Sequence, residues 1–371
     1  MSRVRVAIVG TGGIAGICHM PALRAEHARA EVVAAMDVDA AQVERFCGDH
    51  DIPSAYTDLD RMLDEVRPDL VHVCSPPAVH AAQVAACLRA GAWVLCEKPP
   101  CLSLAEYDTI TAAEGPDGPY AAVVYQHRFG SGARRLRGLI DTGALGRPLV
   151  AQCVTTWYRG HDYFTVPWRG KWETEGGGPT LGHGVHQMDL MLALLGDWSE
   201  VRAMAGRLDR AVETEDVSVA AVRFASGAMA TVVNSVLSPR EESYLRFDFT
   251  EATVELRHLY GYNDGDWAYT PAPHVPAETA AAWTSPGVEI PSSHLAQLGR
   301  LLDCYERGER PSTSGPGGRQ ALEFVTGLYK SALTGRPVTR DELTPADPFY
   351  HRLYGDVPGW APQPAETAEA V

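Results

Sequence analysis

The first part of the chain alternates short apolar runs with segments of mixed polarity, a pattern typical of a parallel sheet covered by helices. Largely apolar runs predict strands at 3–9, 31–36, 69–74, 92–96 and 120–125, and the run at 92–95 is typical of a central strand of a parallel sheet. Helices are expected at 40–49, 57–66 and 103–114, with another that ends at residue 90. This order predicts a doubly wound α/β domain over residues 1–126, a Rossmann-type fold.

After residue 126 the spacing of apolar positions changes. A helix over 134–142 is followed by alternating segments that predict strands at 149–157, 200–208, 217–224, 228–237, 244–250 and 253–256. Helical spacing returns at 292–307 and 315–334. These elements predict a second α/β domain over residues 127–358 with a large, mostly antiparallel open sheet. Residues 359–371 are rich in Pro, Ala and Glu, and are predicted to be a flexible tail.

Composition narrows the classes of function. A chain of 371 residues is too long for one ordinary core, which agrees with two domains. The net charge of −15 argues against nucleic acid and anionic membranes as partners. Apolar runs too short to span a bilayer, no signal-like leader and eight Cys without a CxxC pair predict a cytoplasmic protein with reduced thiols.

The first predicted strand runs directly into a glycine-rich turn of the form G-x-G-x-x-A. Gly10 suits the tight turn and Gly12 allows backbone to approach a pyrophosphate, while Ala15 permits close packing of helix on strand. A helix that begins at Gly13, with Ile14 next, would point its positive end at that phosphate. We therefore predict a dinucleotide site here.

Asp37 ends the second predicted strand, 22 residues beyond Ala15. This is close to the spacing expected for a carboxylate that binds the adenosine ribose hydroxyls. Because no Arg stands nearby to accept a 2′-phosphate, NAD is expected rather than NADP. The alternative is that Asp37 caps the next helix, although Asp39 is better placed for that role.

The third strand ends in Ser75-Pro76-Pro77, followed by His80. Two prolines fix a rigid turn at the carboxyl edge of the sheet, and we expect this turn to hold the nicotinamide end of the cofactor. His80 lies one helical turn further on. It is nearly as compatible with an ordinary buried position on the helix.

The fourth strand ends in Glu97-Lys98-Pro99 and so places an acid and an amine at the edge where open α/β sheets bind ligands. Pro99 cannot donate a ladder hydrogen bond, and it restricts Lys98 to a conformation outside regular pairing. Lys98 is therefore the predicted acid–base residue. The alternative is a surface Lys–Glu pair at a strand exit.

Aromatic and basic residues crowd the segment 157–175. They are Trp157, Tyr158, Arg159, His161, Tyr163, Phe164, Trp168, Arg169 and Trp172. Aromatic faces beside hydrogen-bonding groups suit a sugar ring, but aromatics also dominate oligomer interfaces. Both interpretations stay open at this point.

Three glycines at 176–178 precede a helical segment in which His183, His186 and Asp189 share a face. His186 is predicted to donate or accept a proton at the reacting hydroxyl. It could instead bond a neighbouring loop at the helix start. A metal site made by these three residues is disfavoured, because spacing of i, i+3, i+6 crowds the ligands, and no metal is assigned.

Together these motifs resemble the Gfo/Idh/MocA family of glucose–fructose oxidoreductase, inositol dehydrogenase and rhizopine-catabolism relatives. The resemblance covers about residues 3–340. It is carried by Gly10–Ala15, Ser75–Pro77 with His80, Glu97–Pro99, Arg128-Phe129, Gly176–Gly178 with Gly184, His186 and Asp189, and Gly335–Val338.

The resemblance implies an N-terminal Rossmann domain, a nicotinamide cofactor, a sugar or cyclitol substrate and a homodimer or homotetramer built through the C-terminal sheet. It places Lys98 beside the reacting hydroxyl, with His186 assisting. Gln126 stands where relatives often carry Asn. One departure concerns position 182, where the family commonly has Asp and this chain has Gly182, with His183 next to it.

From the motifs and the resemblance we expect an NAD-dependent dehydrogenase or reductase that acts on CH–OH groups. Alternatives are a glycosidase that uses bound NAD for transient oxidation and elimination, or a cofactor-binding sensor without turnover. The predicted catalytic residues are Lys98, His186 and His183. The predicted cofactor contacts are Gly10, Gly12, Gly13, Ile14, Ala15, Asp37, Ser75, Pro76, His80, Glu97, Lys98 and Gln126. The predicted substrate contacts are Lys98, Arg128, Tyr158, Arg159, Trp168, Arg169, Trp172, His183 and His186.

Overall fold

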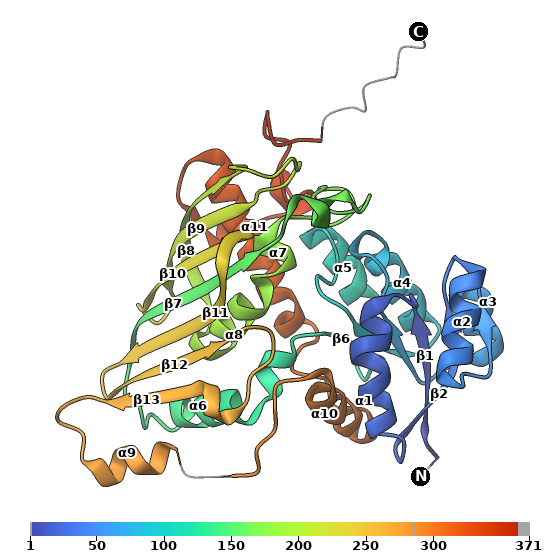
Figure 1. Ribbon diagram of the computed structural model, residues 1–371, viewed down its shortest axis with the longest axis horizontal. Helices are drawn as coiled ribbons and strands as arrows, with labels where there is room; N and C mark the ends of the chain where they lie inside the picture. The colour runs from blue at the N-terminus through green and yellow to red at the C-terminus, as the bar shows by residue number, and fades with distance from the viewer. Residues whose placement is uncertain (1, 285–286, 363–371) are drawn as a thin grey trace.

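The computed structural model describes residues 2–284 and 287–362, and it contains two sheets side by side (Figure 1). The first sheet is parallel, in the order β3-β2-β1-β4-β5-β6. Its strands are β1 (Val4–Val9), β2 (Ala30–Met36), β3 (Ala55–Tyr56), β4 (Leu70–Val73), β5 (Trp93–Cys96) and β6 (Ala121–Val123). Helices α1 (Met20–Ala25), α2 (Ala40–His50), α3 (Leu59–Val66), α4 (Pro77–Arg89) and α5 (Leu104–Ala113) connect them.

The second sheet is mostly antiparallel, in the order β13-β12-β11-β7-β10-β9-β8-β14. Among its described pairs, β7 with β10 is parallel and the others are antiparallel. The strands are β7 (Pro148–Tyr158), β8 (Trp198–Gly206), β9 (Val217–Phe224), β10 (Met229–Ser235), β11 (Leu237–Phe249), β12 (Ala252–His258), β13 (Trp267–Pro271) and β14 (Val338–Thr339). The predicted α/β class with a Rossmann sheet and an open antiparallel sheet is confirmed.

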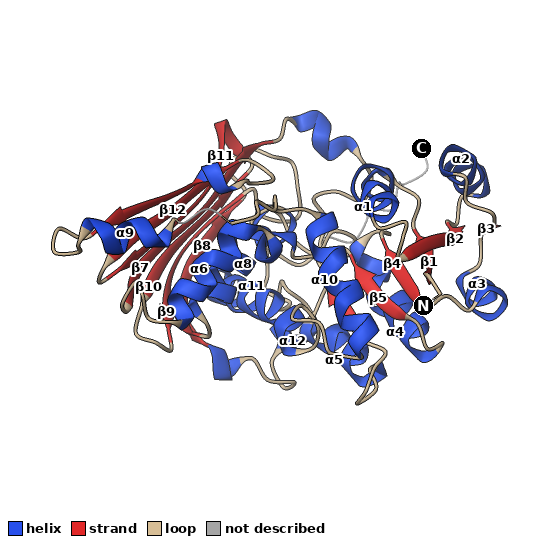
Figure 2. Ribbon diagram, turned by 90° about the horizontal axis from the view of Figure 1, so that it is seen from below, coloured by secondary structure: helices blue, strands red, loops and turns tan. Residues whose placement is uncertain are grey.

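Helices cover one face of the second sheet and leave the other face open (Figure 2). The helices of this part are α6 (Ser131–Asp141), α7 (Pro179–Gly182), α8 (Val185–Leu195), α9 (Ala277–Trp283), α10 (His294–Arg307), α11 (Pro316–Thr334) and α12 (Pro348–His351). Almost every residue of α8 is buried, which agrees with its apolar sequence. On the strands, burial alternates as expected for a sheet with one covered face, clearest on β9.

Helix α10 lies far along the chain but packs against the N-terminal sheet rather than its own. Leu298, Leu301 and Leu302 belong to the same apolar cluster as Val6 and Leu95, and α10 contacts α1. The chain therefore returns to its first domain after completing most of the second sheet. The predicted boundary near residue 126 stays a prediction.

Two further predictions concern the ends of the chain and its thiols. All eight Cys are free, and six of them are buried. The tail predicted over 359–371 is described only as far as Pro362; residues 363–371 lie outside the described part. In the described part of this tail, the Trp360 ring packs against Trp172 and the guanidinium of Arg207. In the described residues, no helix has both the length and the hydropathy needed to cross a membrane.

Candidate active site

A cavity of about 730 Å³ opens between the carboxyl edge of the Rossmann sheet and the helices of the second domain. Its size lies in the ordinary range for a small-molecule site. Predicted residues that line it are Gly10, Gly12, Gly13, Ile14, Asp37, Ser75, Pro76, Glu97, Lys98, Arg159, Trp168, Arg169, His183 and His186. Predicted residues that do not line it are Ala15, His80, Gln126, Arg128, Tyr158 and Trp172.

The glycine-rich turn has the geometry that a pyrophosphate requires. Gly10 adopts φ +86°, and a Cβ there would lie 2.6 Å from the backbone nitrogen of Ser75, so only glycine fits. A Cβ on Gly12 or Gly13 would instead project into open space. Helical backbone begins at Gly13, and the fully buried Ala15 opens the π-helix η1 (Ala15–His19). These residues fit a dinucleotide, whose phosphates would occupy the space beside the turn.

Asp37 lines the cavity next to this turn. Its Oδ2 accepts hydrogen bonds from the Thr11 backbone nitrogen at 2.8 Å and from Gln42 Nε2 at 3.1 Å. The cap of α2 is Asp39, whose Oδ1 accepts from the Gln42 backbone nitrogen. The carboxylate of Asp37 is therefore free of helix capping. No arginine from the Rossmann domain lines the described cavity, which fits NAD better than its 2′-phosphorylated form.

The turn after β4 is braced from behind by His80. Its Nδ1 lies 2.8 Å from the carbonyl oxygen of Pro99, and its Nε2 lies 2.6 Å from that of Ser75. Burial lowers the pKa of His80. The imidazole thus ties two loops of the cavity together without reaching it, as the ordinary buried interpretation expects.

Glu97 sits at the end of β5 as a fully bonded buried carboxylate. Its Oε1 accepts from His19 Nε2 at 3.0 Å and from His294 Nε2 at 2.9 Å, and its Oε2 accepts from the Lys98 backbone nitrogen at 3.1 Å. His19 in turn lies 2.9 Å from His72, between their Nδ1 atoms. Although burial acts in the opposite direction, these hydrogen bonds hold the pKa of Glu97 well below its usual value. A fixed negative charge therefore stands beside Lys98.

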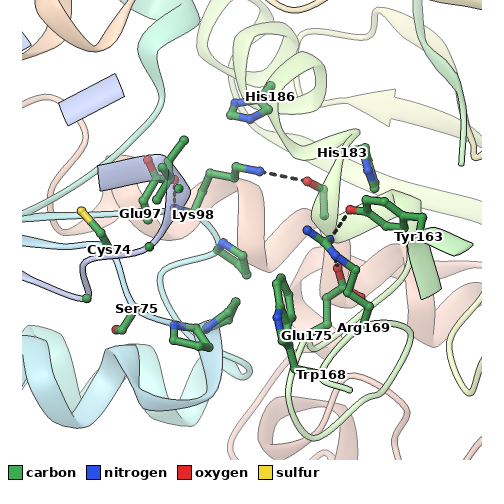
Figure 3. Close-up of a pocket in the computed structure, with 18 of the residues that line it drawn as sticks. Cys74, Ser75, Glu97, Lys98, Tyr163, Trp168, Arg169, Glu175, His183 and His186 are labelled. Carbon is green, nitrogen blue, oxygen red and sulfur yellow. Dashed lines mark hydrogen bonds and ion pairs between the residues drawn. The ribbon is translucent and has the colours of Figure 1, made fainter. Parts of the chain in front are cut away.

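Lys98 projects from the end of β5 across the cavity. Its Nζ donates a 3.0 Å hydrogen bond to the carbonyl oxygen of Gly182, at the end of α7 (Figure 3). Burial lowers the pKa of Lys98, and attraction to Glu97 and Glu175 opposes that change. A lysine with a lowered pKa can release and take up a proton nearer neutral pH.

His183 and His186 face the same space from α8 and the turn before it. Burial lowers the pKa of each well below its usual value, and the charge of Lys98 acts in the same direction. Both imidazoles are therefore neutral at pH 7. Neither ring nitrogen of His186 has a hydrogen-bond partner within the described residues, nor has Nδ1 of His183. Such orphaned nitrogens suit a ligand that carries hydroxyl groups.

The aromatic segment divides between the cavity and the core. Trp168 lines the cavity, and the guanidinium of Arg169 lies 4.3 Å from the centre of its ring. Trp172 is 3% exposed and packs on Tyr329, so its ring lies in the core and does not line the cavity. Tyr158 is 47% exposed and lies outside the cavity. Alternation along β7 turns Tyr158 away from the side to which Trp157 points.

Arg128 and Asp189 form a buried pair rather than part of the cavity. Arg128 Nε donates to Asp189 Oδ2 at 2.8 Å, and its Nη2 donates to Oδ1 at 2.5 Å. This pair joins η2 (Gln126–Phe129) to α8. With Asp189 engaged in this way, it does not form a ligand group with His183 and His186. Gln126 is likewise buried and does not line the cavity.

Ten lining residues were not among the predicted contacts: Val38, Gln42, Cys74, Pro77, Pro99, Trp157, Tyr163, Glu175, Gly182 and Tyr260. Trp157 and Tyr163 lie in the aromatic segment, and their rings approach His183 at 5.2 and 6.1 Å between centroids. Tyr260, which follows β12, approaches the ring of His186. The clustering of aromatic residues could have predicted Trp157 and Tyr163 as cavity residues. No motif in the sequence includes Glu175 or Tyr260, so neither could be predicted in this way.

Family models match both parts of the chain. The model described as oxidoreductase family, NAD-binding Rossmann fold, matches residues 4–123, and the GFO/IDH/MocA C-terminal domain matches residues 133–255. The chain belongs to the Gfo/Idh/MocA family of oxidoreductases. The predicted resemblance is confirmed, as are an NAD cofactor and membership among the dehydrogenases and reductases.

Individual members of the Gfo/Idh/MocA family resemble this chain over nearly its full length. D-glucoside 3-dehydrogenase of Escherichia coli (strain K12) is 28% identical and covers 92% of this chain and 98% of its own length. Myo-inositol 2-dehydrogenase of Thermotoga maritima is 24% identical, covering 92% and 99%. The WlbA dehydrogenase of Chromobacterium violaceum, solved with NADH and UDP-GlcNAcA, has a TM-score of 0.79 at 25% identity, covering 91% and 96%.

Proposed function

We propose that this chain transfers a hydride between NAD(H) and a ring hydroxyl or ketone of a sugar, sugar derivative or cyclitol. The single observation that carries this is one cavity lined by a glycine-rich turn, by Asp37 and by Lys98 with His186. The sugar and inositol dehydrogenases among the relatives support the substrate class.

NAD, when bound, supplies the hydride acceptor for oxidation. Gly12 and Gly13 would hold its pyrophosphate, Asp37 its adenosine ribose, and the Ser75-Pro76 turn its nicotinamide end. Each of these residues lines the cavity.

Lys98 is the proposed acid–base residue. In oxidation, its neutral amine accepts the proton of the reacting hydroxyl, and in reduction its ammonium returns it. His186 is neutral and has two unpartnered nitrogens, so it can hydrogen-bond the same hydroxyl and orient it. His183 offers a further neutral imidazole on the same side.

Substrate contacts are proposed for Trp168, Arg159 and Arg169. Both arginines are already paired, Arg159 with Glu241 at 3.0 Å and Arg169 with Glu175 at 3.2 Å. Their charges are therefore balanced within the protein, which favours a substrate of hydroxyl groups over a strongly anionic one. Trp168 supplies a flat face for the C–H side of a ring.

We further propose that the open face of the second sheet pairs with a second copy of the chain. Met204, Val219, Val233, Val154 and Tyr244 form one cross-strand row on that face, over β8, β9, β10, β7 and β11. Met204 and Val219 are exposed, and no helix among the described residues covers this side (Figure 2). An exposed apolar row of this kind is typical of an interface.

A panel of sugars, glycosides and inositols, each with NAD and with NADP, tests the reaction through NADH absorbance. Oxidation of a neutral ring alcohol with net NADH formation supports the proposal. Substrate cleavage without net NADH would indicate the glycosidase alternative. Cofactor binding with no turnover across the panel would favour the sensor.

A further inference from the structure

Glu175 is a buried acid in the wall of the cavity that no motif singles out. It is 8% exposed, and it follows the aromatic segment just before Gly176. Its Oε2 accepts a 2.6 Å hydrogen bond from the Gly170 backbone nitrogen, and its Oε1 accepts from Arg169 Nη1 at 3.2 Å. Burial raises the pKa of Glu175, whereas the Gly170 amide, Arg169 and Lys98 lower it. Its charge is thus coupled to Lys98.

Gly182 relates this carboxylate to the lysine. The carbonyl of Gly182 accepts the hydrogen bond from Lys98 Nζ. A Cβ added to Gly182 would lie 3.9 Å from Glu175 Oε1 and would meet no other neighbouring heavy atom within 4 Å. Glu175 therefore presents its oxygen to the space that a side chain at position 182 would enter. Figure 3 shows Glu175 beside Arg169.

We propose that Glu175 is the carboxylate partner of Lys98 in this chain and that it replaces an acid absent from position 182. The inference rests on the proposed acid–base role of Lys98. Glu175 acts as a positioning residue, because it influences the proton on Lys98 through its charge and does not itself need to touch the substrate. The Gly170 and Arg169 bonds hold the carboxylate in the cavity wall.

The charged groups around Lys98 determine whether loss of the Glu175 charge raises or lowers the pKa of Lys98. The groups that act on it are Glu97 at its own strand end, Glu175 and Arg169 from the aromatic segment, and Cys18 from the first helical segment. His183, His186 and His127 are neutral at pH 7, because burial holds their pKa values well below the usual range. The two carboxylates favour the ammonium form, while burial and Arg169 oppose it. Loss of Glu175 charge must therefore lower the pKa of Lys98.

The sequence makes this pKa directly measurable, because lysine occurs only at Lys98, Lys171 and Lys330. Competitive acetylation with acetic anhydride at a series of pH values, read by peptide mass spectrometry on the full chain, reports the reactive neutral fraction of each amine. Lys171 is exposed and serves as the internal reference. Neither NAD nor substrate is needed, so failure of the proposed reaction would leave this test intact.

In Glu175→Gln, the titration of Lys98 is expected to move to lower pH by about one unit, the scale of losing one nearby opposite charge. Glu173→Gln is the matched control, because Glu173 is an exposed acid two residues away and should leave Lys98 unchanged. Glu175→Gln with Gly182→Asp should return the titration to within about half a unit of wild type.

Gly182→Asp alone should move the titration of Lys98 to higher pH. If Glu175→Gln does not fold by itself, the comparison of the double variant with Gly182→Asp decides the matter, because Lys98 should titrate at lower pH in the double variant. An unchanged titration in Glu175→Gln, or no rescue by Gly182→Asp, would overturn the proposal and leave Glu175 as a structural partner of Arg169. With an active substrate, the acidic limb of kcat/KM should move in the same direction as the labelling.

Discussion

Lys98 Nζ donates a 3.0 Å hydrogen bond to the carbonyl oxygen of Gly182, and this contact joins the strand end of one domain to the short helix of the other. The amine therefore stands between the predicted cofactor turn and the two histidines. A single side chain in this position can act on a substrate that both domains enclose.

Lys98→Arg separates proton transfer by residue 98 from the effect of its positive charge, because arginine keeps the charge but does not deprotonate. We expect kcat to fall about 10²- to 10⁴-fold, the ordinary contribution of a positioned proton acceptor, while NAD still binds. His186→Ala should cost less. Steady-state kinetics and calorimetric NAD titration measure kcat and NAD affinity for both variants. If Lys98→Arg turned over like wild type, Lys98 would not be the base, and His183 or His186 would be the candidates for that role.

The pH profile gives an independent check on Lys98. Because burial lowers the pKa of Lys98, oxidation should rise with pH through a value below that of a free lysine. Reduction needs the proton on Lys98 and should fall over the same range. In Lys98→Arg, neither the rise of the oxidation rate nor the fall of the reduction rate with pH should remain. A pH dependence that persists in this variant would come from another titrating group.

Asp37→Ala should weaken NAD binding by about 1–3 kcal/mol, the scale of losing hydrogen bonds to a charged acceptor. Wild type should bind NAD more tightly than NADP, since no Rossmann-domain arginine lines the described cavity. Calorimetric titration of both cofactors measures this. Tighter binding of NADP by wild type would contradict the assignment. Asp39→Ala is the control, which should lower the free energy of unfolding through its lost cap and leave the cofactor preference unchanged.

Trp168 and Trp172 should behave differently although both lie in one aromatic segment. Trp168→Ala should raise KM for the sugar and leave NAD affinity unchanged. Trp172→Ala should instead lower the free energy of unfolding by about 3–5 kcal/mol, because its ring is buried against Tyr329. Kinetics and denaturant titration of both variants make the comparison. A rise in KM with unchanged stability in Trp172→Ala would refute this division.

The open sheet face predicts association of copies. Val219→Asp would place a charge at one of the two exposed positions of the apolar row and should shift sedimentation toward smaller species. Val288→Asp, at a valine that is 85% exposed elsewhere, is the control and should sediment as wild type. Identical sedimentation of both variants and wild type would remove this face from consideration.

Local patterns of apolar and polar residues were sufficient to predict many of the strands. The buried strands β1, β4 and β5 were predicted from largely apolar runs, interrupted by Arg5 in β1 and His72 in β4. The alternating sequence of β9 agrees with a strand that is buried on one face. Boundaries were less accurate where one strand follows another closely. The segment expected as one strand at 228–237 ends at Ser235, and β11 begins at Leu237 because the chain turns there. The short strand β14 depends on pairing with β8, more than 130 residues earlier, and was not predicted. The short strand β13 pairs with the preceding strand β12 and was also not predicted.

Residues at strand ends were the predictable part of the site. Asp37 and Lys98 line the cavity because carboxyl ends of parallel strands share one edge. Arg128 and Trp172 are residue types that often contact ligands. In this structure each contacts a buried residue of the protein instead. Sequence cannot reveal such pairing, since the partners lie far along the chain. Glu175 was missed for the converse reason: its importance comes from its relation to Gly182.

The return of α10 to the first sheet has a consequence for engineering by recombination. A chimera that exchanges only residues 1–126 between relatives would separate Leu298, Leu301 and Leu302 from the strands on which they evolved to pack. It would also part His294 from Glu97, which it bonds at 2.9 Å. The unit to transplant when cofactor preference is to be changed is therefore discontinuous: the N-terminal segment together with residues 294–307.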